Sequence, residues 1–73
     1  MKRPPTEIER AVIEYLTEHP GAKRREIAKA FSWDVGRTRW VLMTMVSNGF
    51  ISRQQSLVNL RADGYSYYAA VLI

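Results

Sequence analysis

Residues that end helices divide the first 49 positions of the chain into three short segments. Proline cannot continue a helix and glycine weakens one, so His19-Pro20-Gly21 ends the first segment. Asn48-Gly49 ends the third, because glycine suits the left-handed position that follows a helix. The turn at Ser32-Trp33 separates the second segment from the third. These stops predict three helices before residue 50, with the last two closely joined.

The first helix begins at a capping box. Thr6 and Glu9 have the S/T-x-x-E spacing in which each side chain accepts from the backbone N–H of the other residue. The following residues are apolar with the period of an amphipathic helix, which predicts a buried stripe. The members of this stripe are Ile8, Ala11, Val12, Tyr15 and Leu16.

The second helix is predicted over residues 24–31 and the third over residues 34–48. Asp34 is a good N-cap for the third helix, because its carboxylate can accept from free backbone N–H groups. Trp33, in the turn, is predicted to be a large core residue. The apolar faces predicted to be buried consist of Ile27, Ala28 and Phe31 in the second helix, and Thr38, Val41, Leu42, Met45 and Val46 in the third.

The pattern after Gly49 is that of strands. Residues 50–55 and the tyrosine-rich residues 65–71 are β-prone, and they are predicted to pair as a hairpin with its tip at residues 57–63. In a strand Tyr65 and Tyr67 share one face and Tyr68 takes the other. Packing against the helices explains part of this set, and stacking on bases is the alternative.

The order helix, helix, short turn, helix, hairpin resembles the winged helix-turn-helix family over residues 6–71. Glu26-Ile27-Ala28 matches its "xEIA" signature, which follows a small strand residue, and Asn48-Gly49-Phe50-Ile51 matches the "xxGxI" run that enters the wing. The resemblance implies an α+β fold: a three-helix core followed by a β-hairpin wing. It implies one domain over residues 6–73 after a flexible basic arm at residues 1–5. In size the chain is similar to small regulators of fimbrial operons and to regulators carried by phages or plasmids.

The charge distribution favours an anionic partner. The net charge is +4 at pH 7, yet residues 6–19 hold four glutamates and a single arginine. Residues 20–73 are therefore strongly basic, and a field of this kind attracts polyanions. A solvated basic surface without a partner is the alternative that charge alone leaves open.

The resemblance implies a sequence-specific regulator of transcription whose third helix reads the major groove of double-stranded DNA. Arginine suits this task because it can bind guanine O6 and N7 with two hydrogen bonds, or neutralise a phosphate. The wing and the arm, with Lys2 and Arg3, would reach the minor groove or the backbone. The predicted contacts are Arg37, Arg39, Trp40 and Thr44 to bases, Lys23, Arg24, Arg25 and Gly36 to phosphates, and Arg53 and Arg61 from the wing.

Two of these residues keep alternatives. Trp40 either packs on the hairpin, contacts DNA, or anchors a protein partner together with Met43, since tryptophan is frequent at interface hot spots. Gly36 either allows a phosphate to approach the backbone or has no special role. A protein-interaction module is accordingly the runner-up function, and a phage or plasmid factor for replication or recombination is a third.

Other classes of function lack their signatures. There is no cysteine, and no metal-ligand spacing, phosphate loop, nucleophile elbow or carboxylate pair. We therefore expect no catalysis and no cofactor. No apolar run is long enough to span a membrane, and the basic start lacks the apolar stretch of a signal peptide. The expectation is a cytoplasmic protein that is a monomer or a weak homodimer.

Overall fold

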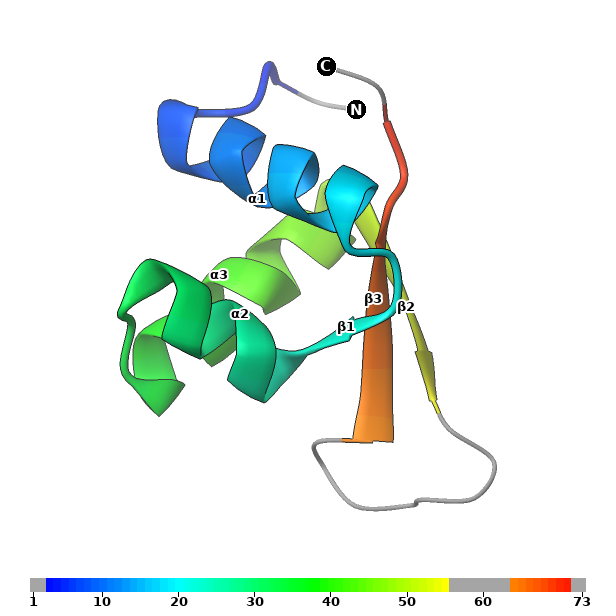
Figure 1. Ribbon diagram of the computed structural model, residues 1–73. Coiled ribbons are helices and arrows are strands. Elements are labelled where there is room, and N and C mark those ends of the chain that lie inside the picture. The colour runs from blue at the N-terminus through cyan, green and yellow to red at the C-terminus, as the bar shows by residue number, and fades with distance from the viewer. Residues whose placement is uncertain (1–2, 56–63, 72–73) are drawn as a thin grey trace.

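The computed structural model describes residues 3–55 and 64–71. In this part of the chain three helices precede an antiparallel hairpin, so the predicted α+β architecture is confirmed (Figure 1). Helix α1 crosses one side of the molecule, and α2 and α3 pack beneath it next to the sheet. The elements are α1 Glu7–Glu18, β1 Ala22–Lys23, α2 Arg24–Phe31, α3 Val35–Ser47, β2 Ile51–Gln55 and β3 Tyr65–Ala69.

The capping box of α1 is present as predicted, with Thr6 as N-cap and both reciprocal hydrogen bonds formed. The predicted stripe is wrong at one end, because Ile8 is 44% exposed. The helix turns Glu9 and Ile13 inward instead, together with Val12 and Leu16. A buried glutamate is tolerated there because its carboxylate is fully satisfied by hydrogen bonds, which apolar periodicity does not register.

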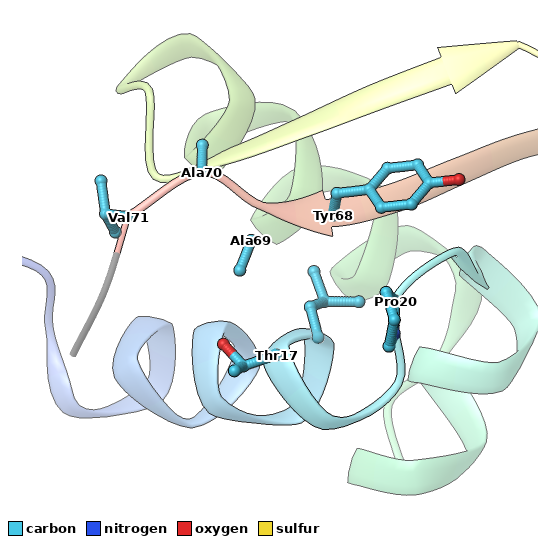
Figure 2. A pocket seen from close by; sticks show the side chains of 7 residues that line it. Thr17, Pro20, Tyr68, Ala69, Ala70 and Val71 are labelled. Carbon is cyan, nitrogen blue, oxygen red and sulfur yellow. The ribbon is translucent and has the colours of Figure 1, made fainter.

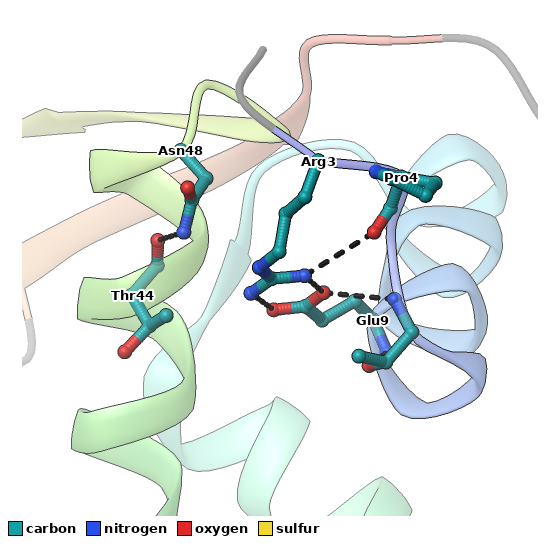
Figure 3. Close-up of polar contacts among 6 residues, drawn as sticks. Arg3, Pro4, Glu9, Thr44 and Asn48 are labelled. Carbon is teal, nitrogen blue, oxygen red and sulfur yellow. Dashed lines mark hydrogen bonds and ion pairs between the residues drawn. The ribbon is translucent and has the colours of Figure 1, made fainter.

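Arg3 holds the Glu9 carboxylate from outside α1 (Figure 3). Its two terminal nitrogens donate to the two oxygens of Glu9 at 2.6 and 2.8 Å, and the Thr6 N–H donates to Oε1 at 2.9 Å. The Arg3 guanidinium also lies 5.5 Å from the centroid of the Phe50 ring. Hydrogen bonding to Arg3 lowers the pKa of Glu9 from 4.5 to about 2. The flexible arm over residues 1–5 stays a prediction, but Arg3 itself is engaged with the core.

Glu9→Gln is expected to lower the free energy of unfolding at pH 6 by about 1–2 kcal/mol, because it breaks the ion pair with a partly exposed arginine. The folded-state pKa is depressed, so this stabilisation is complete above pH 4.5 and is lost as the pH falls toward 2. The difference between wild type and variant should therefore shrink over that range. Urea denaturation at stepped pH measures it. A difference that stays constant would contradict the linkage, and Glu14→Gln, an exposed glutamate of the same helix, is the control.

The segment from α2 to α3 follows the prediction closely. Ser32 takes the left-handed conformation, with φ of +56°, and ends α2. Trp33 is half-buried and stacks on Phe31 with 4.8 Å between ring centroids, so it seals the edge of the core and does not fill its centre. Asp34 caps α3 as expected, since its Oδ1 accepts from the Arg37 N–H at 2.7 Å.

Helix α3 buries the face that the sequence predicts. Thr38, Leu42 and Met45 are fully buried, and the Thr38 hydroxyl donates to the Asp34 carbonyl at 2.7 Å. Gly49 has φ of +79° and turns the chain out of the helix. Phe50 then enters the core, where the other buried apolar residues are Val12, Ile13, Leu16, Ala22, Ile27, Leu42, Met45, Ile51 and Tyr67.

The sheet has the strand order β1-β3-β2, with all pairs antiparallel. Arg53 and Ala22 pair with Tyr67 from opposite sides, which fixes a register that the sequence left open. Tyr67 is buried while Tyr65 and Tyr68 are half-buried, so the expected packing of the tyrosines is confirmed for Tyr67. The predicted tip at residues 57–63 lies outside the described residues.

A hollow of about 320 Å³ lies between the end of α1 and β3 (Figure 2). Its walls come from Leu16, Thr17 and Pro20 on one side and from residues 68–71 on the other. These residues are uncharged, and none of them belongs to α3. This hollow is therefore not the basic surface expected from the sequence.

Candidate nucleic-acid interface

Helix α3 exposes three large apolar residues, with Trp40 and Met43 on its outward face and Val35 at its first position. Val35 is 64% exposed, Trp40 65% and Met43 59%. Trp40 therefore does not pack on the hairpin, and that alternative is wrong. Trp40 and Met43 are three positions apart, so they are neighbours on the side of the helix opposite the buried Thr38 and Leu42. The face that the sequence assigned to the major groove is free for contact.

Three arginines line one hollow beside this face. Arg24 comes from the first turn of α2, Arg39 from α3 and Arg53 from β2, and the hollow has a volume of about 190 Å³. The other lining residues are Met43, Tyr65 and Tyr67. The Arg53 guanidinium lies 4.7 Å from the centroid of the Tyr65 ring, a cation–π contact that orients it. Like charges from three elements gather here, and an anion would relieve their repulsion.

Arg37 lies on the other flank of α3. Together with Trp40 and Thr44 it lines a second hollow, of about 440 Å³, whose opposite wall is Ile8 and the Arg3–Glu9 pair. Its guanidinium lies 5.5 Å from the centroid of the Trp33 ring. Residues two positions apart point to different sides of a helix, so Arg37 and Arg39 cannot act as one pair. The structure thus divides the predicted base contacts between two flanks.

The predicted phosphate contacts are also separated. Lys23 is already used inside the sheet, where its ammonium donates to the Gly64 carbonyl at 3.3 Å and to Ser66 Oγ at 3.0 Å. Arg25 is exposed at the start of α2. Gly36 is exposed in the first turn of α3, and a Cβ added there would meet only Asp34 Oδ1, at 3.6 Å. Arg61, predicted in the wing, lies outside the described residues.

Sequence reasoning missed two contributors to this surface. Tyr65 and Tyr67 line the arginine hollow, although they were predicted only as core or as a stacking platform. The sequence did indicate that the two tyrosines share one face of β3. That face could be placed at the hollow only once the pairing of Arg53 with Tyr67 was known.

The main-chain carbonyl of Thr44 accepts a hydrogen bond from Asn48 Nδ2 at 2.9 Å (Figure 3), and this local bond closes the C-terminal end of α3.

Two features are absent from the part of the chain that the structure describes. No group of three histidine, aspartate or glutamate side chains is placed to hold a metal ion. None of the helices is long and apolar enough to cross a membrane.

Comparisons with known proteins agree with this geometry. A family model described as winged helix-turn-helix DNA-binding matches residues 5–52, about two thirds of the chain. A solved structure of the transcriptional regulator SlyA is similar in fold, with a TM-score of 0.80 and 23% sequence identity. The match covers 89% of this chain but 44% of that one, so the chain spans less than half of that regulator. A search of curated proteins gives no match.

Proposed function

The chain belongs to the winged helix-turn-helix DNA-binding family, and on this premise we propose that it is a sequence-specific regulator of transcription. It binds double-stranded DNA with α3 in the major groove and the hairpin beside it. The similarity of its fold to a transcriptional regulator supports the regulatory part of the proposal. A cytoplasmic location, and a monomer or weak homodimer, belong to the same proposal.

One observation carries the proposal: Arg24, Arg39 and Arg53 reach a common hollow from α2, α3 and β2. Phosphates lie along both strands beside the major groove, so a helix in the groove has phosphates at its flanks. Arg24 and Arg53 are placed beside α3 to bind them. Arg39 is on α3 itself, and it is our candidate for bidentate binding to guanine.

Arg37 and Thr44 remain candidates for base contacts on the flank of α3 that faces α1. Arg25 stands next to Arg24 and adds to the field that attracts DNA. Lys23 is a weaker candidate than the sequence alone suggests, because its ammonium already binds two acceptors on the sheet side. For Arg61, the DNA contact from the wing that the sequence predicts is part of this proposal.

Selection of bound duplexes from a pool with a 20-base-pair random centre tests this function. A specific regulator should enrich a shared sequence. Its affinity for that selected duplex should fall with salt, at a log–log slope of about −0.9 for each phosphate neutralised. The two phosphate contacts proposed for Arg24 and Arg53 would contribute about −1.8 to this slope. An unenriched pool, or binding that is independent of salt, would sink the proposal.

Gly36→Ala separates the two interpretations of that glycine. A Cβ at position 36 would make only an ordinary van der Waals contact, and alanine forms helices better than glycine does. The free energy of unfolding should therefore rise by about 1 kcal/mol. If the DNA backbone or a base edge approaches Gly36, affinity for the selected duplex should fall about tenfold at the same time. Thermal melting and a binding titration measure the pair of effects. Greater stability with unchanged affinity would assign Gly36 no role in binding.

The runner-up function, a module that captures a protein through Trp40 and Met43, has one observation in its favour, namely their exposure. The three arginines that line one hollow beside them suit nucleic acid better, because a cluster of like charges attracts a polyanion. If a Trp40→Ala variant binds DNA as well as the wild type does, the protein-interaction module becomes the better explanation for the exposed Trp40.

A further inference from the structure

We propose that α3 recognises thymine methyl groups, so that the target site has T·A pairs where Val35, Trp40 and Met43 meet it. This inference rests on the proposed function, and it specifies which bases the helix reads. Recognition by arginine alone would favour guanine. The apolar face described here adds a second requirement, which the arginines do not supply.

The first support is where the exposed apolar side chains lie. Four large hydrophobic residues are exposed in the described part of the chain, and three of them are on α3. The fourth, Ile8, is on α1. Isolated apolar residues on a surface need no explanation, but Trp40 and Met43 lie side by side on one helix face and form a cluster, which marks a contact surface. This cluster lies on the helix that the family uses to bind DNA.

The second support is the charge that flanks the cluster. Arg39 lies on one side of Trp40 and Met43, and Arg37 lies on the other. A surface of this kind fits a partner that is anionic at its edges and apolar in between. DNA has this arrangement in its major groove where thymine is present, because phosphates border the groove and the C5-methyl of thymine projects into it.

The third support is the shape of the helix surface next to Trp40. Gly36 is one turn before Trp40 on the same face, and its missing side chain leaves the backbone open. Val35 stands at the N-terminal end of α3, the end that contacts base edges in helix-turn-helix proteins. The helix start can therefore come close to the bases while Trp40 and Met43 cover methyl groups farther along.

Replacement of thymine by deoxyuridine tests the proposal, because it removes the methyl and keeps every hydrogen-bonding group. The probe is the duplex selected above, made once with thymine and once with deoxyuridine in both strands. Each buried methyl contributes about fourfold in affinity, so two contacts predict about 15-fold weaker binding to the deoxyuridine duplex. Equal affinity for the two duplexes would overturn the proposal.

Variants of the protein assign the effect to residues. In a Trp40→Ala/Met43→Ala protein the preference for thymine over deoxyuridine should fall to less than about threefold, because the apolar surface is gone. Val71→Ala, which truncates an apolar residue that lines neither hollow beside α3, should keep the full preference. An undiminished preference in the double variant would show that the methyl groups act through DNA shape, and it would overturn the proposal. Failure of the regulatory function itself is distinguishable, since the selection would then yield no duplex to compare.

Discussion

A protein in which Arg24, Arg39 and Arg53 are all changed to glutamine is expected to bind the selected duplex at least about 10³-fold more weakly. A hydrogen bond to a charged group contributes about 1.5–3 kcal/mol, and three such bonds are lost together. The three side chains line one hollow but come from three elements, so the variant removes the positive surface and leaves the core intact. No substituted residue is part of that core.

The salt series distinguishes this loss from a general effect of charge. The log–log slope should become less steep by about 1.8, the value for two phosphates, because Arg24 and Arg53 bind the backbone and Arg39 binds a base. A change of about 2.7, with sequence preference retained, would assign Arg39 to a phosphate instead. Arg10→Gln/Lys29→Gln, in which two exposed cations outside the hollow are removed, is the control and should lose less affinity per charge. An equal loss per charge would contradict the hollow as a binding site.

The helices were predictable because their ends are specified by local chemistry. The capping box at Thr6, the N-cap Asp34 and the left-handed Gly49 each act within a few residues along the chain. The buried face of α1 was less predictable. Ile8 looks like core by hydrophobicity, but Glu9 takes the inward position because Arg3 and Thr6 satisfy its carboxylate. That compensation involves a residue outside the helix, which periodicity does not include.

The sequence predicted which residues belong to the candidate site better than it predicted how those residues are arranged in space. The sequence assigned both Arg37 and Arg39 to base contacts because neither is on the buried face of the helix, but the helical turn directs them to opposite flanks. It treated Arg24 and Arg53 separately, although folding brings them to one hollow. Lys23 was predicted as a phosphate contact before its pairing with Ser66 was known. In each case the missing information was the arrangement of α2 and β2 around α3.

The exposure of Trp40 shows the same limit. A tryptophan on an amphipathic helix is compatible with burial, with DNA and with a partner, and only the position of the hairpin decides among them. The hairpin leaves Trp40 exposed, and its Tyr65 and Tyr67 line the arginine hollow on the other flank of α3. The structure thereby removes one alternative and strengthens the interpretation of α3 as a contact surface.

Phe50→Ala is expected to lower the free energy of unfolding by about 3–5 kcal/mol, the usual cost of truncating a fully buried phenylalanine. A domain of 73 residues has a total stability of about 4–11 kcal/mol, so the change removes a large part of it. Phe50 is 0% exposed, and it joins α3 to β2. Its N–H donates to the Met45 carbonyl and its carbonyl accepts from the Ala70 N–H, each at 3.0 Å.

Phe31→Ala is the matched control, because Phe31 is the second phenylalanine of the chain and is half-buried at the end of α2. It should cost about 1–2 kcal/mol, in proportion to the smaller area that it buries. Urea denaturation followed by tryptophan fluorescence compares the two variants. Equal losses would contradict the central position of Phe50.

The effect of Phe50→Ala on DNA binding should follow the folded population. Arg39 and Arg53 lie on the two elements that Phe50 connects, so the arginine hollow exists only while this junction is packed. Affinity for the selected duplex should therefore be reduced much more at 37 °C than at 15 °C, near the temperature of maximum stability. Phe31→Ala should show a weaker dependence on temperature. A loss of affinity by Phe50→Ala that is the same at both temperatures would mean that Phe50 acts on the interface directly and not through the fold.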